Sequence, residues 1–349
     1  MMQNMKQFNG GTLLRRDVWA RSDHNRLGMN YRAQAGALPW AGDIWDIHTH
    51  LQTMEGARVY FEVARLYGVT KTWTMSPLSI IDELQSTYAE RVAFIAVPDF
   101  MNFKKNPQVF TSGWLKDIET YAAKGVKICK FWCAPRGRDL HPALLIDSAI
   151  RKEAMALAAS LGMMFMMHIG DPDTWFATHY KDSRRYGTKR DQYVPLERLL
   201  DQHGDTPLIA AHLGGTPENL DFLQGLLDRH PNLYLDSSAT KWMVRELSKQ
   251  PERFKAFLEA NPGRVCFGSD IVANDENLDF DLYASRYWAL REMFETGYRG
   301  ASPIADPDLH LIDPSVATNA SPMLCGMKLE PSTLGGLYQY AAANLTGLD

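Results

Sequence analysis

Long apolar runs and paired cysteines are both missing from this sequence, and each absence removes a class of protein. No apolar run approaches the roughly 18–20 residues of a membrane-spanning helix. The few cysteines show no CxxC spacing and no dense framework, so a disulfide-stapled secreted fold is not indicated. We therefore expect a reduced, cytoplasmic protein. The four cysteines are Cys129, Cys133, Cys266 and Cys325.

The sequence also has no large excess of charge of one sign. The 37 Lys and Arg residues against 41 Asp and Glu give a net charge of −4, and no basic field is present. We therefore expect a small-molecule substrate and neither nucleic acid nor membrane as partner. The first 28 residues contain the pair Arg15 and Arg16 but no apolar segment of a secretory leader. Neither a Sec nor a Tat signal is expected.

Hydrophobic residues make up 45% of the chain, enough for a substantial core. They form short apolar runs, each followed by a longer stretch with helical periodicity. The short runs are mostly continuous rather than alternating, which is typical of a parallel sheet covered on its outside. The eight expected strands lie within residues 43–50, 69–76, 92–100, 125–133, 163–172, 207–215, 232–239 and 265–271. The last two expected helices of this series cover residues 245–263 and 281–297.

Eight strand–helix units over about 250 residues predict an α/β fold of the (β/α)8, or TIM-barrel, type. A doubly wound open sheet is the rival, but no Gly-rich phosphate loop opens a first helix. We expect one domain over residues 1–349, with an N-terminal extension at 1–42, a barrel core at 43–296, and a C-terminal loop and helix at 297–349. A barrel this rich in Trp and Tyr is also expected to form a homo-oligomer.

Two histidines stand where the first apolar strand ends, in the stretch "AGDIWDIHTHLQT". Residues i and i+2 of a strand point to the same face, so His48 and His50 project together. His168, His212 and Asp270 occupy the ends of expected strands 5, 6 and 8. In a parallel barrel these strand ends meet at one edge, where barrel enzymes keep their active sites.

Packing alone explains a single histidine at a strand end, because such residues are often hydrogen-bonded wall residues. It does not explain five polar residues at the ends of apolar strands. Four imidazoles and a carboxylate converging on one edge indicate a metal site. The other histidines fall in loops or at helix ends, as surface histidines do: His24, His141, His179, His203, His230 and His310.

The stretches "HTH", "MMHIGDP", "AAHLGG" and "CFGSDI" make the chain resemble the amidohydrolase superfamily over residues 43–348. Within it, the pattern is similar to the amidohydrolase-2, or aminocarboxymuconate-semialdehyde decarboxylase-like, branch. The resemblance implies that His48, His50, His168 and Asp270 bind one divalent metal ion, usually zinc, with manganese as the alternative. It also implies that His212 handles protons or polarises the substrate. The terminal signature departs from the branch, because Ala341 replaces an expected Asn.

This chemistry favours a metal-dependent hydrolase acting on a small amide, ester or lactone through a metal-activated water. Asp270 can bind the metal through one oxygen and accept a proton through the other. Non-oxidative decarboxylation of an aromatic or unsaturated carboxylic acid remains the alternative, since metal and His212 serve either route. A barrel that binds metal and ligand without catalysis is the third hypothesis.

Three further residues are candidates for substrate binding. Lys127 and Lys130 are three positions apart on expected strand 4, so their side chains point to opposite faces and at most one points into the barrel. The resemblance implies that Lys130 is the inward one. Some members of the superfamily bridge two metals with a carboxylated lysine here; a pocket lysine is the simpler interpretation. Arg136 follows strand 4 and can grip a substrate carboxylate from the rim. Trp132 can form a wall of the pocket or pack in the core.

Overall fold

The computed structural model describes residues 22–98, 106–140 and 144–348. Residues 1–21, with the pair Arg15 and Arg16, the last two residues of the expected strand 92–100 and His141 therefore lie outside the described residues. The main sheet has nine strands in the order β8-β7-β6-β5-β4-β3-β2-β1-β9, and every pairing in it is parallel. The strands are β1 Ile44–Leu51, β2 Val69–Met75, β3 Val92–Ala96, β4 Ile128–Trp132, β5 Met164–His168, β6 Leu208–Ala210, β7 Leu233–Asp236, β8 Val265–Cys266 and β9 Ile271–Ala273.

The eighth barrel strand is divided into β8 and β9, and the sheet closes through this divided strand. On one side, the Ser237 amide donates to the carbonyl of Cys266 at 3.0 Å. On the other side, the Ile47 amide donates to Phe267 O at 3.0 Å, and the Asp270 amide donates to His48 O at 2.8 Å. Hydrogen bonds to β7 and β1 thus flank residues 265–273 on both sides. The predicted (β/α)8 barrel is confirmed.

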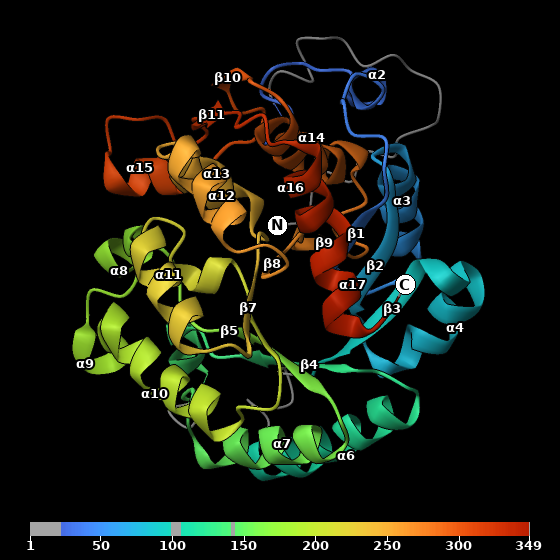
Figure 1. The fold of residues 1–349 in the computed structure, drawn as a ribbon, viewed down its shortest axis with the longest axis vertical. Helices are drawn as coiled ribbons and strands as arrows, with labels where there is room; N and C mark the ends of the chain where they lie inside the picture. The colour runs from blue at the N-terminus through green and yellow to red at the C-terminus, as the bar shows by residue number, and fades with distance from the viewer. Residues whose placement is uncertain (1–21, 99–105, 141–143, 349) are drawn as a thin grey trace, which may run out of the picture.

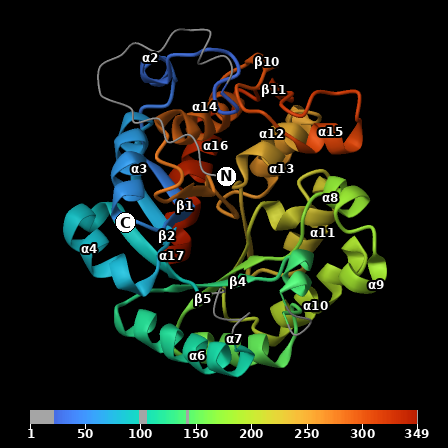
Figure 2. The ribbon, with the colours of Figure 1, turned by 180° about the vertical axis from the view of Figure 1, so that it is seen from behind.

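Helices form a ring outside the strands (Figure 1), and the reverse view shows the same ring from behind (Figure 2). In α11, for example, the Asn219 side chain accepts from Phe222 N, and one face buries Leu220, Leu223, Leu226 and Leu227. The covering helices are α3 Met54–Leu66, α4 Leu78–Tyr88, α6 Pro107–Ala123, α7 Ala149–Ser160, α10 Lys189–Gln202, α11 Leu220–Arg229, α13 Pro251–Ala260 and α14 Phe280–Glu295. Two short helices, α8 Asp173–Thr178 and α9 Ser183–Tyr186, lie in the connection after β5.

The prediction of a single helix over residues 245–263 is wrong, because the structure has two helices in this region. The first, α12 Thr240–Leu247, begins five residues earlier than expected. The second, α13, has Pro251 in its first turn. A proline has no amide hydrogen and clashes with the carbonyl of the preceding turn, so it starts a helix more readily than it continues one.

The C-terminal segment closes one end of the barrel interior. The barrel's inner cluster includes Ile47, Met166 and Ile209, and Ala341, Ala342 and Leu345 of the last helix pack against it. The Phe267 amide also donates to Leu337 O at 2.9 Å. A small residue at 341 therefore fits a fully buried position. This last segment consists of α16 Pro331–Gly335, the π-type turn η4 Gly336–Tyr340 and α17 Ala341–Thr346.

The segments outside the barrel lie mainly beside α12 and α14 (Figure 1). They comprise α2 Tyr31–Ala35, the antiparallel pair β10 Arg299–Ala301 and β11 Met323–Cys325, and α15 Asp308–Ile312. Arg245 of α12 binds the carboxylates of Asp306 and Asp308, and all three side chains are buried. Among the described helices, none is long and apolar enough to cross a membrane.

Candidate active site

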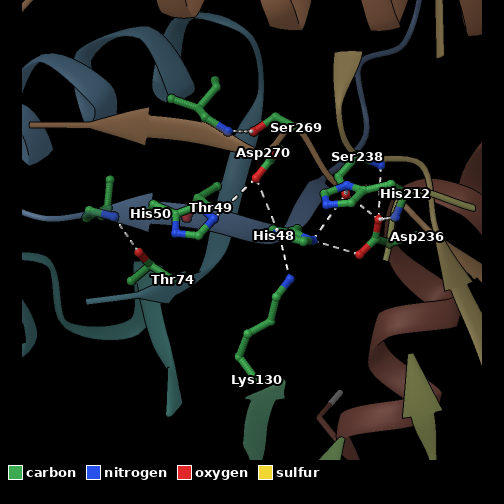
Figure 3. A network of polar contacts seen from close by, with 12 residues as sticks. His48, Thr49, His50, Thr74, Lys130, His212, Asp236, Ser238, Ser269 and Asp270 are labelled. Atoms are coloured by element: carbon green, nitrogen blue, oxygen red, sulfur yellow. Dashed lines mark hydrogen bonds and ion pairs between the residues drawn. The ribbon is translucent and has the colours of Figure 1, made fainter. Parts of the chain in front are cut away.

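The five predicted site residues all lie at the carboxyl ends of barrel strands. His48 and His50 are on β1, His168 is the last residue of β5, and His212 lies just beyond β6. Asp270 lies between β8 and β9. Figure 3 shows His48, His50, His212 and Asp270 gathered around one region, with Lys130 reaching into it from β4. The edge that the sequence predicts is therefore the edge at which these side chains meet.

Left-handed backbone accompanies these strand ends. His212 has φ 59°, Asp270 has φ 58°, and Ala239, which precedes α12, has φ 64°. Non-glycine residues adopt this conformation at a cost of order 1–3 kcal/mol. The hydrogen bond from the Asp270 amide to His48 O holds one of these bends in place. The turns direct the side chains of His212 and Asp270 toward the cluster rather than along the strand.

Three side chains form a compact group that can hold a metal ion. His48, His212 and Asp270 each offer one ligand atom, and these atoms lie within 4.8 Å of one another. A carboxylate oxygen of Asp270 is 3.5 Å from His48 Nε2 and 3.2 Å from His50 Nε2. The structure thus brings His50 to the same carboxylate, although it is not part of the compact group.

His48 is oriented by a carboxylate that the sequence interpretation missed. Its Nδ1 lies 2.8 Å from Asp236 Oδ2, and both side chains are fully buried (Figure 3). The other oxygen of Asp236 accepts from the His212 amide at 2.8 Å and from the Ser238 hydroxyl. A carboxylate behind a ligating imidazole fixes the ring and leaves its other nitrogen for the metal. The available signal was the Asp at the end of strand 7 in "NLYLDSS".

His168 has a similar carboxylate partner. Its Nε2 lies 2.9 Å from Asp171 Oδ1, and the Tyr180 hydroxyl donates to the other oxygen of that buried carboxyl group. The His168 ring centroid is 4.6 Å from that of His212, so it stands beside the compact group. With Nε2 engaged, Nδ1 is the ring nitrogen left for a metal. Its assignment as a ligand stays a prediction.

Lys130 points inward, as expected of the inward lysine of strand 4. It is buried, and its Nζ lies 3.0 Å from His48 Nε2 (Figure 3). Burial lowers the pKa of Lys130 to about 8, against the opposing charges of Asp236 and Asp270. The lysine therefore meets the same imidazole nitrogen that a metal would use.

Protonation states at the cluster suit metal ligation. Burial lowers the pKa of His48, with the Lys130 charge adding to the effect, and burial lowers the pKa of His212 well below its ordinary value. Burial alone would raise the pKa of Asp270, but the neighbouring His212 and a hydrogen bond from His50 hold it below its ordinary value. Neutral imidazoles and an ionised carboxylate are the forms that bind a divalent ion.

A second buried carboxyl group, Asp46, supports the cluster from behind. It accepts from the His48 amide at 3.1 Å, from the Ser269 hydroxyl at 2.6 Å and from the Tyr287 hydroxyl at 2.8 Å. It thereby ties the backbone of His48 to the residue before Asp270. Burial raises the pKa of Asp46 to about 7, although these hydrogen bonds oppose the rise. Its place two residues before His48 was visible in the sequence, but no pattern distinguished it from a strand residue.

The donor set therefore fits a divalent ion. The described residues provide imidazole nitrogens and a carboxylate, two of the imidazoles have carboxylate partners behind them, and the compact group spans less than 5 Å. Imidazole-rich sets with one carboxylate are typical of zinc, and also accept manganese. The identity of the ion is not fixed by these residues.

The cluster opens into a cavity of about 970 Å³. Lys130 and Trp132 line it, and their contact with a substrate stays a prediction. Arg136 does not line this cavity; it is exposed, and its guanidinium lies 5.9 Å from the ring centroid of Trp175. The remaining lining residues come mainly from the ends of the other barrel strands and from α6, α12 and α14.

The chain is similar to one protein family and to several solved structures. A family model described as Amidohydrolase (Amidohydro_2) matches residues 46–306. No curated protein matches the chain. A crystal structure of 5-carboxyvanillate decarboxylase LigW from Sphingomonas paucimobilis matches 88% of this chain and 99% of its own chain, at 9% identity and a TM-score of 0.47. The family match covers well over half of the chain and includes every strand-end residue of the cluster, so the protein belongs to the amidohydrolase family.

Proposed function

We propose that the protein is a metal-dependent hydrolase that acts on a small amide, ester or lactone. The observation that carries the proposal is the compact group of His48, His212 and Asp270 at the carboxyl edge of the barrel, with its ligand atoms within 4.8 Å and a cavity in front of it. His48 and Asp270 of this group, together with His50 and His168 beside it, would hold the ion, and His212 would face the substrate. A divalent ion held there, zinc first and manganese second, acidifies water and polarises a carbonyl group.

The residues of the chain provide the proton transfers. Asp270 is ionised at neutral pH, so its carboxylate can take a proton from the attacking water. His212 is neutral, and its Nδ1 lies 2.7 Å from Ser238 Oγ, which leaves Nε2 for the substrate. Because the Ser238 hydroxyl donates to Asp236, Nδ1 of His212 carries the ring hydrogen and Nε2 is an acceptor. Nε2 can take the proton that Asp270 received from the water and pass it to the leaving group as the carbon–oxygen or carbon–nitrogen bond breaks.

Decarboxylation is the second candidate, and Lys130 is the observation that favours it. A buried amine beside His48 places positive charge on the cavity lining, where it can hold a carboxylate close to the cluster. The proton required at the carbon that loses CO₂ would then come from Lys130 or His212.

The test combines metal analysis with a substrate screen of the purified protein. We expect elemental analysis to find one divalent ion per chain, and we expect esters, lactones or amides to be hydrolysed only while that ion is present. Release of CO₂ from aromatic or unsaturated acids without hydrolysis would favour the second candidate. Bound metal with no turnover in either screen would favour a barrel that only binds ligand.

A further inference from the structure

Two cationic side chains, Lys241 and Arg286, line the cavity on the wall formed by α12 and α14. Neither side chain belongs to the compact group of possible metal ligands, and neither takes part in the proton transfers described above. Both are partly buried. Because a partly buried charge costs free energy, two of them on one wall require an explanation.

The backbone that carries Lys241 is fixed to the cluster. Thr240 Oγ1 donates to the carbonyl oxygen of Ser269 at 3.2 Å, and Ser269 immediately precedes Asp270. Lys241 is the next residue along α12. Its ammonium makes no hydrogen bond and no ion pair with any residue in the described ranges. Burial lowers the pKa of Lys241, and the nearby charge of Arg286 lowers it further.

Arg286 has unused donors as well. Its Nη1 donates to Ser285 Oγ at 3.0 Å and contacts His24 Nδ1 at 3.4 Å. Within the part of the chain that the structure describes, Nε and Nη2 have no hydrogen-bond partner. These two groups share one edge of the guanidinium, and this edge forms the two-pronged donor that fits a carboxylate.

Nearby acids do not cancel these charges. Asp306 and Asp308, which act on Lys241 through space, are bound to Arg245. Two further acids also act on the pair, Asp23 on Lys241 and Asp279 on Arg286. Neither forms an ion pair with Lys241 or Arg286 in the described structure.

The cavity itself has two acidic lining residues, and neither is on this wall. Asp270 belongs to the metal-binding group. Asp117 is on α6, across the barrel from α12 and α14 (Figure 1). His24 adds no positive charge at neutral pH, since burial and then Arg286 lower its pKa to about 4. This wall of the cavity therefore carries positive charge without an acid of its own.

We propose that the substrate carries a carboxylate that binds between Lys241 and Arg286 while its reacting group faces His48, His212 and Asp270. This inference rests on the proposed function, and it adds a substrate class to it: a small organic anion. The carboxylate would accept two hydrogen bonds from the free edge of Arg286 and one from Lys241. It would also remove the repulsion between the two cations.

The test compares benzoate with benzamide, its neutral counterpart of the same shape. Binding is measured by isothermal titration calorimetry at low ionic strength, on the protein as purified and again after metal removal by chelation. We expect benzoate to bind about tenfold more tightly than benzamide in both preparations, because each charge-assisted contact contributes at this level. Lys241→Gln and Arg286→Gln should each weaken benzoate about tenfold and leave benzamide within about twofold.

Two further variants complete the design. Lys241→Arg keeps the charge and should retain benzoate affinity within about threefold. Lys255→Gln, on α13 and outside the cavity lining, is the matched control and should change nothing. If Arg286→Gln fails to fold, as judged by circular dichroism, the comparison of Lys241→Gln with Lys241→Arg decides the question.

Several results would overturn the proposal. Equal affinities for benzoate and benzamide would do so. Benzoate binding that disappears on chelation and has the same affinity in Lys241→Gln as in the wild type would also overturn it. Inorganic phosphate that binds more tightly than benzoate, with the same dependence on Lys241, would show that the site takes a different anion. Absence of turnover in the hydrolase screen would contradict the proposed function but would leave the benzoate result on chelated protein unchanged.

Discussion

Nζ of Lys130 lies 3.0 Å from Nε2 of His48, the ring nitrogen that the Asp236 bond leaves free. A bridging carbamate on this lysine would require a neutral amine that reacts with carbon dioxide. The described residues provide one compact donor group for a metal ion, and Lys130 meets it as an amine. We therefore expect one metal equivalent per chain, in the wild type and in Lys130→Ala alike. The measurement is metal content after purification with bicarbonate and excess zinc or manganese. Two equivalents in the wild type that fall in the variant would show a binuclear site.

Asp236→Asn tests the carboxylate behind His48. The amide keeps the size of the side chain but loses the charge and one of the two acceptor oxygens, so an NH2 group faces either His48 Nδ1 or the His212 amide. We expect metal affinity to fall about 10- to 100-fold, as is usual when a carboxylate behind a ligating histidine is removed. Competition with a chromogenic chelator measures the change. Asp205→Asn, at an exposed position, is the control. Unchanged affinity would mean that His48 is not a ligand.

His168→Ala and His212→Ala together test the ligand assignment. The Asp171 bond gives His168 the orientation of a ligating imidazole, whereas His212 is held by a serine hydroxyl. We expect His168→Ala to lose most of the metal and His212→Ala to keep it while losing turnover about 100-fold or more. Elemental analysis and initial rates are the measurements. The reverse pattern of metal loss would assign the site to His48, His212 and Asp270 alone.

Gly215→Ala should destabilise the protein strongly. Gly215 has φ 73°, and an added Cβ would overlap the carbonyl group of Gly170, which is backbone and cannot move aside. Left-handed strain and overpacking together should cost about 3–4 kcal/mol of unfolding free energy. Gly113→Ala in α6 is the matched control, since its Cβ meets nothing within 4 Å and should add about 0.5–1 kcal/mol. Urea unfolding measures both, and a Gly215 variant as stable as the wild type would contradict the geometry.

The free energy of unfolding should fall at acidic pH, because His24 must then take up a proton. Burial, then Arg286, lowers its pKa from 6.5 to about 4 in the folded protein. The unfolded chain therefore binds more protons between these two pH values, so this contribution is complete above pH 6.5 and is lost as the pH falls toward 4. Since the imidazole keeps some contact with solvent, we expect a loss of about 1–2 kcal/mol rather than the full shift.

Unfolding free energies at pH 7 and pH 4.5, measured for the wild type and His24→Gln, isolate this contribution, because other groups cancel in the difference. The variant should lose less stability than the wild type over this interval. An equal loss in both proteins would show that His24 titrates normally.

The sequence predicted most of the barrel because each strand was a continuous apolar run closed by a helix. It predicted β8 and β9 as one strand, since the interruption arises from the bend at Asp270, where the carboxylate turns toward His48. It predicted one helix where α12 and α13 are separate, although Pro251 marked the break. Local pattern thus located the elements, while the positions of bends depended on contacts between strands.

The site was predictable where its residues follow apolar strands. His48, His50, His168, His212 and Asp270 were found in this way, and Asp236 had the same signal. Lys241 and Arg286 were not predictable, because they are 45 residues apart in sequence and only the packing of α12 against α14 brings them to one wall. Arg136 was chosen for its position after strand 4, which does not determine the direction of a loop side chain.

One stretch of chain, the divided eighth strand, both closes the barrel and contributes a residue to the metal site. Residues 265–273 join the last strand to the first, and Asp270 within them faces His48 of that first strand. An ion bound by both side chains would cross-link the last strand of the barrel to the first. Amide hydrogens along this stretch should then exchange more slowly in metal-loaded protein, even though most of them never approach the ion.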